Sequence, residues 1–334
     1  MPWEIQFHRK GLHLPQIGWW LDATRPVDRA FVSHAHFDHF AAHREIICTP
    51  GTAKLMRARL RGRRVEHALP FGHAEQLDPE TTITLLPAGH IHGSAQCLLD
   101  HARHGTLLYT GDFKLRPGRS AEPCAAPRAD TLVMETTFGK PRYAFPPADE
   151  ILAAIVAFCR DTLAAGANPV LFGYSLGKSQ EILACLAEAA LPVMLHAETF
   201  RLTQVYEKLG LVFPAHRRFD ERESAGHVII CPPQWGETPF LQKIPARRTA
   251  VISGWAMDRA TPYRYHCDTA FPLSDHAGYD DLLRYVELVR PRLVYTVHGF
   301  ATEFARDLRA RGIEAWALGR ENQLDLALAC DGLS

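Results

Sequence analysis

The chain has 334 residues, and its 37 lysines and arginines are balanced by 37 aspartates and glutamates. This length is typical of about two domains of ~150 residues each, and the 47% content of hydrophobic residues excludes a wholly disordered chain. Zero net charge excludes a protein that coats nucleic acid or anionic membrane by bulk attraction, but it leaves room for a local basic track.

Cysteines and hydropathy predict a cytoplasmic protein without a membrane segment. No apolar run approaches the ~20 residues of a membrane helix, and charges interrupt the N-terminus where a signal peptide is apolar. The eight cysteines are scattered and form no CxxC pair, which favours free thiols. Twelve of the 18 histidines lie between His8 and His104, and this crowding is typical of metal ligands.

Residues 1–135 are predicted to form short strands, at residues 29–33, 82–86, 96–99, 106–110 and 131–134, with one helix at residues 52–61. After the prolines between 141 and 147 the pattern changes to a strand–helix alternation that predicts a parallel sheet. Its expected helices are residues 149–165, 178–190 and 199–209, and its expected strands are residues 169–172, 193–196, 228–231 and 250–253. The chain then continues with a helix at 279–289, a strand at 293–297, a helix at 303–311 and a strand at 314–318.

The strongest functional signal is the segment FVSHAHFDH at residues 31–39, in which an apolar strand runs into His34, His36, Asp38 and His39. Side chains two residues apart in an extended segment point the same way, so His34 and His36 can bind one ion together. Asp38 and His39 follow a turn and could bind a second ion. Imidazole and carboxylate ligands suit zinc, with manganese as the alternative. A solvated, histidine-rich loop is the competing interpretation.

This segment resembles the HxHxDH signature of the metallo-β-lactamase fold superfamily. The resemblance implies further ligands downstream, namely His90 in the loop after the strand TITLL and Asp112 in the string YTGD. It also implies that Asp22, in the string WLD, orients ligands without binding metal. Singly, His90 and Asp112 could be ordinary polar loop residues, but both follow predicted strands in the expected order.

Three later residues resemble motifs A, B and C of the β-CASP nuclease branch of that superfamily. They are Glu135 in METTFG, His276 in SDHA and His298 in VHG. Singly, Glu135 could begin a loop, His276 could cap a helix, and His298 could be a core histidine. Together, in family order and after predicted strands, they indicate the nuclease branch.

The resemblance implies an α/β fold with two parts. Residues 1–145 and 271–334 are expected to form the αββα sandwich of the metallo-β-lactamase fold. Residues 146–270 are expected to form an inserted β-CASP domain that contains the parallel sheet.

The resemblance also implies a substrate. The strings GYSLGKSQE and SGWAMDR are most similar to bacterial exonucleases associated with DNA ligase genes. They imply a DNA exonuclease of DNA repair that acts on single-stranded DNA and is functionally associated with a DNA ligase. A histidine at motif C is typical of RNA-processing members, so RNA is the alternative substrate.

In the mechanism that the resemblance implies, two divalent ions activate a water for attack on a phosphodiester. The implied ligands of the first ion are His34, His36 and His90, those of the second are Asp38, His39 and His298, and Asp112 bridges the two ions. His276 would protonate the leaving oxygen, and Glu135 would orient His276.

The string Gly173–Gly177, GYSLG, offers a rival interpretation because GxSxG between a strand and a helix is typical of serine hydrolases. Ser175 would be the nucleophile, but the histidine cluster would then have no purpose. In the nuclease interpretation Ser175, Lys178 and Ser179 would bind a phosphate at the start of a helix. A plain strand–helix turn is the third alternative.

Two further features could contact nucleic acid. Residues 57–64 contain five arginines, which either form a solvent-exposed helix end or bind phosphates away from the bond that is cleaved. Trp19, Trp20 and Trp235 could stack bases, but burial in a core is the favoured interpretation.

Overall fold

The computed structural model describes residues 2–234 and 238–319, so Trp235 lies outside the described residues. The chain divides into two compact units. The first unit contains Met1–Pro117, Ala121–Pro141 and His276–Ser334, and the second contains Gly118–Ser120 and Arg142–Asp275. The second unit therefore includes the segment in which the sequence predicts an inserted domain. No described helix is both long and apolar enough to cross a membrane.

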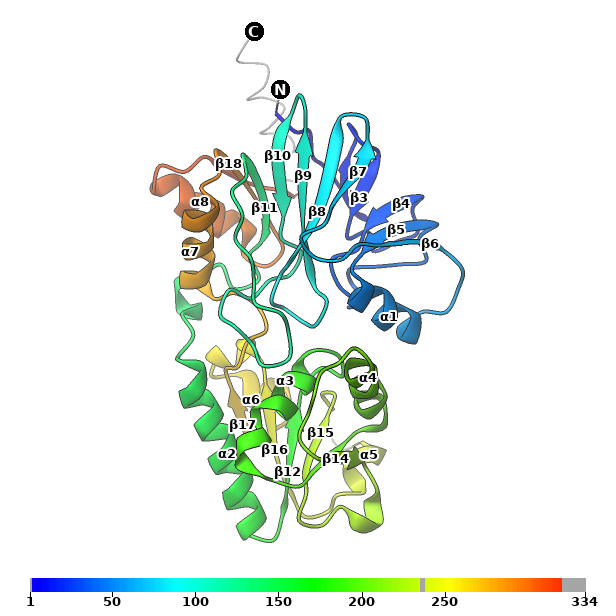
Figure 1. The fold of residues 1–334 in the computed structure, drawn as a ribbon. Coiled ribbons are helices and arrows are strands. Elements are labelled where there is room, and N and C mark those ends of the chain that lie inside the picture. Colours follow the sequence, from blue (N-terminus) through cyan, green and yellow to red (C-terminus); the bar gives the residue numbers. More distant parts are fainter. Residues whose placement is uncertain (1, 235–237, 320–334) are drawn as a thin grey trace. The chain divides into compact units, whose positions relative to one another are not determined.

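The first unit is built on two β-sheets (Figure 1). The first sheet contains, in spatial order, β1 (Gln6–His8), β2 (Gly11–Leu14), β3 (Trp19–Leu21), β4 (Arg29–Phe31), β5 (Glu45–Cys48) and β6 (Val65–Ala68). The second sheet contains, in spatial order, β19 (Ala315–Ala317), β18 (Leu293–Val297), β11 (Thr131–Glu135), β10 (Gly105–Tyr109), β9 (Ala95–His101), β8 (Thr81–Pro87) and β7 (Ala74–Asp78).

One apolar core lies between these two sheets, with Leu21 and Phe31 from the first sheet and Leu85, Leu107 and Val133 from the second. A second core lies on the other face of the second sheet, under α7 (Tyr279–Val289) and α8 (Ala301–Ala310). Helix α1 (Pro50–Arg59) joins β5 to β6, and the 3₁₀ helix η1 (Pro141–Tyr143) follows β11. The result is a two-sheet sandwich with helices outside it.

The second unit contains a six-stranded sheet whose pairings are all parallel. Its strands, in spatial order, are β14 (His216–Arg218), β13 (Val193–Leu195), β15 (Val228–Cys231), β12 (Asn168–Phe172), β16 (Arg247–Ile252) and β17 (Thr269–Phe271). Its helices are α2 (Ala148–Ala164), α3 (Lys178–Cys185), η2 (Ala187–Ala189), α4 (Ala197–Lys208), η3 (Glu221–Glu223), α5 (Pro239–Gln242), η4 (Gly254–Met257) and α6 (Thr261–Arg264).

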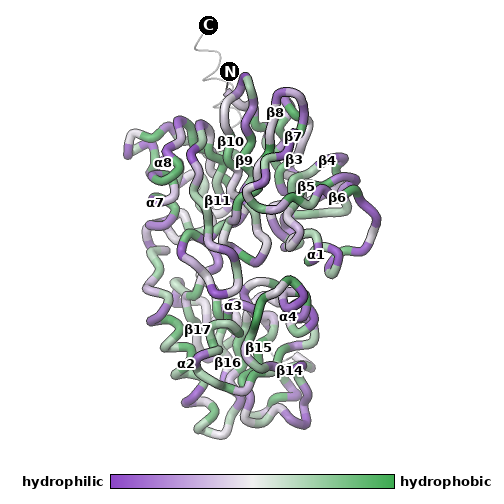
Figure 2. Tube along the Cα trace, viewed as in Figure 1, coloured by the Kyte–Doolittle hydropathy of each residue, from purple (hydrophilic) through white to green (hydrophobic). Residues whose placement is uncertain are grey.

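Both faces of this parallel sheet are buried. Leu171 and Ile230 pack with α2 and α3 on one face, and Val170, Phe172 and Ile229 pack on the other. Burial on two faces favours apolar strands, and β15 (VIIC) appears green in the tube of Figure 2. The sandwich of the first unit and this parallel sheet confirm the predicted fold class.

Most predicted elements are present, and the differences are local. The predicted helix at residues 178–190 is divided: α3 ends at Cys185 and η2 follows, before Ala190 takes a left-handed conformation with φ of 51°. The strands that the sequence analysis missed are short, and several are polar and exposed, such as β6 (VEHA) and β14 (HRR). The seven described cysteines are free, as predicted, and Cys330 lies outside the described residues.

Candidate metal centre

Parallel strands bring three of the predicted site residues to one edge of the second sheet. β10, β11 and β18 are parallel neighbours, so their carboxyl ends lie together. Asp112 follows β10, Glu135 ends β11, and His298 follows β18. Gly111, with φ of 55°, lets the chain pass Ser33, since a Cβ there would lie 2.5 Å from that of Ser33.

Four predicted ligands of one ion lie together. His34, His36, His90 and Asp112 each offer a ligand atom within 4.8 Å of the others. His36 Nδ1 is 3.0 Å from His34 Nε2 and 3.2 Å from His90 Nε2. Asp112 Oδ2 is 3.6 Å from His34 Nε2 and 3.8 Å from His90 Nε2.

These separations fit a zinc-sized ion. Four ligands about 2.0–2.2 Å from a tetrahedral ion lie roughly 3.3–3.6 Å from one another. The cluster also has the ligand types that zinc prefers, three imidazoles and one carboxylate. The residues present therefore fit a divalent metal ion in type and in approximate spacing.

The second predicted ligand set is arranged more loosely. His39 Nε2 lies 3.1 Å from Asp112 Oδ2 and 3.9 Å from Asp38 Oδ2. The rings of His39 and His298 have their centres 6.1 Å apart. Asp38, His39 and His298 line one cavity of about 160 Å³. The assignment of this set to a second ion stays a prediction.

The electrostatics of the cluster favour a bound cation. Burial, together with the positive charge of neighbouring histidines, holds the pKa of His34 well below its ordinary value, so its imidazole is neutral. Burial raises the pKa of Asp112, but the charges of His39 and His276 outweigh it, and the pKa lies well below the ordinary value. Burial lowers the pKa of His39, but Asp112 and Asp22 raise it well above the ordinary value. An ionised Asp112 carboxylate thus lies between the neutral imidazole of His34 and the imidazole of His39, on which Asp112 and Asp22 favour positive charge.

Asp22 is hydrogen-bonded to three residues around the cluster, namely Ser33, His39 and Tyr109. It accepts hydrogen bonds from the Ser33 amide and hydroxyl at 2.7 and 2.6 Å, from His39 Nδ1 at 2.9 Å and from the Tyr109 hydroxyl at 2.9 Å. The bond to Nδ1 leaves His39 Nε2 directed at Asp112. Asp22 and His298 are also two of the few non-glycine residues with positive φ, 45° and 60°, and such strain is common at functional sites.

We expect Asp22→Asn to weaken metal binding about 10- to 100-fold, because the amide nitrogen cannot accept the bonds from His39 and Tyr109. Tyr109→Phe, which removes a single donor, should have a smaller effect. Metal affinity is measured by titration against a competing chelator. Wild-type affinity in Asp22→Asn would show that Asp22 does not orient the ligands.

The predicted pair of His276 and Glu135 adjoins the cluster. His276 Nδ1 lies 2.8 Å from Glu135 Oε1, and that carboxylate is fixed by the amides of Phe113 and Thr137 at 3.1 and 3.0 Å. The centres of the His276 and His90 rings are 4.6 Å apart. Glu135 therefore fixes the orientation of the His276 ring through Nδ1.

Several residues that hold the ligand loops were missed by the sequence analysis. Glu122 contacts His92 Nδ1 at 3.0 Å and accepts from the Gly93 amide at 2.9 Å, which supports the loop that carries His90. Arg59 donates to the carbonyl of Ala35, between two ligands, and lies 3.9 Å from the centre of the Phe37 ring. Long-range partners of this kind have no local sequence signal.

The predicted phosphate-binding residues lie in the second unit and are engaged there. Lys178 is 2% exposed, and its Nζ lies 2.7 Å from the carbonyl of Leu273 and 3.1 Å from Asp275. The buried Ser179 hydroxyl donates to the carbonyl of Gly173. This geometry does not favour the phosphate-binding role of Lys178 and Ser179, which stays a prediction.

Ser175 has no catalytic base beside it in the described structure. Its hydroxyl contacts that of Thr199 at 3.4 Å. The two residues considered for a triad have other partners, since Asp275 contacts Lys178 and His276 contacts Glu135. A serine nucleophile needs a hydrogen-bonded base, and this arrangement does not provide one.

This chain matches one protein family near its C-terminal end and shares a fold with a solved structure. Residues 269–318, which include His276 and His298, match the family "Zn-dependent metallo-hydrolase RNA specificity domain". A solved structure of a protein of unknown function from Enterococcus faecalis V583 aligns over 87% of this chain and 79% of its own, with a TM-score of 0.58 and 13% identity. At this identity the likeness shows a common fold.

Curated relatives are similar over most of this chain. A "Probable DNA ligase" of Opitutus terrae is 62% identical over 98% of the chain, which covers 32% of that protein. A "5' exonuclease Apollo" of Rattus norvegicus is 29% identical over 78% of the chain and 49% of that protein. A "Transcription termination factor FttA" of Methanocaldococcus jannaschii is 26% identical over 65% of the chain and 39% of that protein. The chain thus spans about a third to a half of these relatives.

Proposed function

The chain belongs to the β-CASP family of the metallo-β-lactamase fold, and on that premise we propose that it is a metal-dependent nuclease that hydrolyses phosphodiester bonds. The observation that carries the proposal is the cluster of His34, His36, His90 and Asp112 beside the pair of Glu135 and His276. A centre that activates water and stabilises charge, together with a donor of a proton to the leaving oxygen, suits phosphodiester hydrolysis.

Residues of the first unit would supply the metal ligands, the proton donor and the groups that orient them. One divalent ion would be held by His34, His36, His90 and Asp112, and a second by Asp38, His39, His298 and the same Asp112. Bound divalent ions lower the pKa of water towards neutrality and offset the charge that develops on the phosphate. His276 would donate a proton from Nε2 to the leaving 3′ oxygen, and Glu135 would keep its ring in place. Asp22 would keep the His39 ring in the orientation that binds metal.

We propose single-stranded DNA as the substrate and an exonuclease of DNA repair as the role. Support comes from the 62% identity to part of a "Probable DNA ligase" and from the similarity to a "5' exonuclease". The same likeness supports functional association with a ligase. The second candidate is an RNA-processing nuclease, which the histidine at position 298 and the RNA-specificity family match favour.

End-labelled single strands of DNA and RNA, each incubated with zinc and with manganese, test this proposal. Release of labelled mononucleotides from the 5′ end of DNA, faster than from RNA, is the expected result. Faster or internal cleavage of RNA would support the second candidate, and cleavage of neither strand would contradict nuclease activity.

We expect Ser175→Ala to keep turnover within about twofold of wild type, because no covalent intermediate on Ser175 is involved. A fluorophosphonate probe should label neither protein. Labelling of Ser175 with a matching loss of activity would instead support the serine hydrolase.

A further inference from the structure

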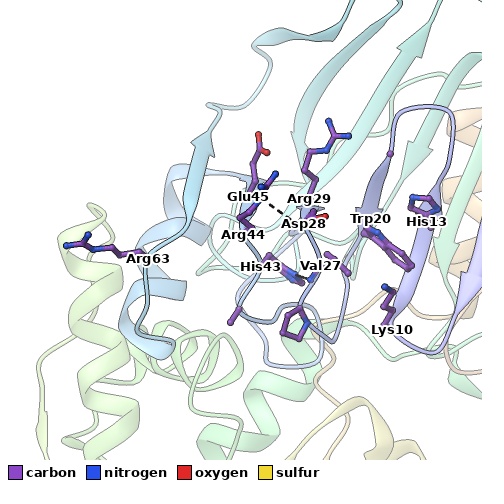
Figure 3. Close-up of a pocket in the computed structure, with 13 residues that line it drawn as sticks. Lys10, His13, Trp20, Val27, Asp28, Arg29, His43, Arg44, Glu45 and Arg63 are labelled. Carbon is purple, nitrogen blue, oxygen red and sulfur yellow. Dashed lines mark hydrogen bonds and ion pairs between the residues drawn. The ribbon is translucent and has the colours of Figure 1, made fainter.

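A polar cavity of about 880 Å³ lies on the first unit, and none of its lining residues belongs to the metal cluster (Figure 3). It lies along β2, β3, β4 and β5 and the loops that precede β4, β5 and β6. Its volume is in the range of small-molecule sites, but its lining is polar. The residues that matter for its chemistry are Lys10, His13, Trp20, Arg29, Arg44 and Arg63.

The cavity is positively charged. It is lined by four cations and two carboxylates, an excess of two positive charges in a chain whose net charge is zero. Of these cations only Arg44 forms an ion pair among the described residues, at 3.7 Å from Asp28. Both side chains are mostly exposed, 74% and 86%, so water screens the pair and leaves Arg44 available. Arg29 and Arg63 are exposed as well.

An aromatic side chain lies at one side of this charged surface. Trp20 is half-buried, whereas Trp19 and Leu21 on either side of it point into the core. The ring of His13, its cross-strand neighbour, lies 4.6 Å from that of Trp20 at 30°, and Lys10 Nζ lies 4.2 Å from the Trp20 ring centre. Figure 3 shows these three side chains together, near the strand that carries Arg29. A cation–π contact at the surface, such as that of Lys10 with Trp20, is weak, so a planar group can displace Lys10 from the ring.

We propose that this cavity binds a segment of single-stranded nucleic acid away from the metal centre. A base stacks on Trp20, and Lys10, Arg29, Arg44 and Arg63 contact phosphates. The proposal rests on the proposed nuclease function, since the ligand is the substrate strand. Arg29 begins β4 and the metal ligand His34 follows five residues later, so their Cα atoms are at most about 18 Å apart, which a single strand can span.

Equilibrium binding of a fluorescent DNA strand of about 20 nucleotides, measured in chelator so that no cleavage occurs, tests the proposal. We expect Trp20→Ala to weaken binding about 5- to 150-fold, and Trp20→Phe to weaken it less because a stacking ring remains. Arg44→Gln and Arg63→Gln should each lower the slope of log affinity against log salt by about 0.7. Arg284→Gln is the matched control, an exposed arginine on α7 that contacts Glu287 at 3.0 Å.

Length dependence separates this site from the metal centre. With metal present, cleavage of a strand of about 4 nucleotides by the variants should match wild type, because a strand so short that is being cut occupies the metal centre and cannot reach the cavity as well. With metal restored, KM for the long strand should rise while kcat is unchanged. Wild-type binding by Arg44→Gln and Arg63→Gln, or an equal loss in Arg284→Gln, would overturn the proposal. If the variants weaken binding of the long strand but the wild-type protein cleaves no strand when metal is restored, the result would contradict the nuclease function and leave the binding site supported.

Discussion

Asp112→Asn is expected to abolish metal binding and turnover together. Oδ2 of this carboxylate lies 3.6 Å from Nε2 of His34, 3.1 Å from Nε2 of His39 and 3.8 Å from Nε2 of His90. It is therefore the one negatively charged group that belongs to both predicted ligand sets. The amide keeps the size of the side chain but removes its negative charge. Turnover should fall at least about 1000-fold, which corresponds to several kcal/mol of transition-state stabilisation.

Elemental analysis of protein purified without chelator, together with the initial rate of cleavage, measures this effect. Asp100→Asn is the matched control, because Asp100 is an exposed aspartate on β9 of the same unit. It should retain about two ions per chain and full activity. Metal content and rate that stay at the wild-type level in Asp112→Asn would show that the cluster is not the catalytic centre.

His276→Ala is expected to lower turnover about 100- to 10,000-fold, the usual contribution of a positioned acid, while metal content and substrate affinity stay unchanged. The reason is geometric. Glu135 binds Nδ1 of this ring at 2.8 Å and is itself held by two backbone amides, so the orientation of the ring is fixed beside the cluster. His276 is also not needed for either predicted ligand set.

A substrate whose bridging 3′ oxygen is replaced by sulfur tests this role, because a thiolate leaves without a proton. The defect of His276→Ala should shrink on this substrate, and Glu135→Gln should show the same trend with a smaller loss. If the sulfur substrate is cut no better relative to wild type, or if His276→Ala loses metal, His276 is not the general acid.

The sequence predicts those site residues that lie close together in the chain or that follow one another in the order of known motifs. His34, His36, Asp38 and His39 are close in sequence, and their alternation in an extended segment already predicts shared ligation. The parallel sheet could be predicted from hydrophobic runs, because its strands are buried on both faces, whereas the sandwich was implied by the family resemblance.

The contacts that could not be predicted depend on sheet register and on packing between distant segments. The hydrogen bond from Tyr109 to Asp22 joins residues 87 positions apart, and no pattern in either segment indicates it. Lys178 after a glycine at a helix start predicts an exposed phosphate ligand, yet it is buried against Leu273 and Asp275. Trp20 and Trp19 are adjacent, and only the register of β3 decides which one faces outward.

Metal titration of chelator-treated protein tests the central claim most directly. Cleavage of end-labelled single-stranded DNA should be absent after chelation and should return as zinc or manganese is added, reaching its plateau near two equivalents per chain. Asp112→Asn should regain no activity at any metal concentration. Cleavage that survives exhaustive chelation, or DNA and RNA that both stay intact at every metal concentration, would contradict a metal-dependent nuclease.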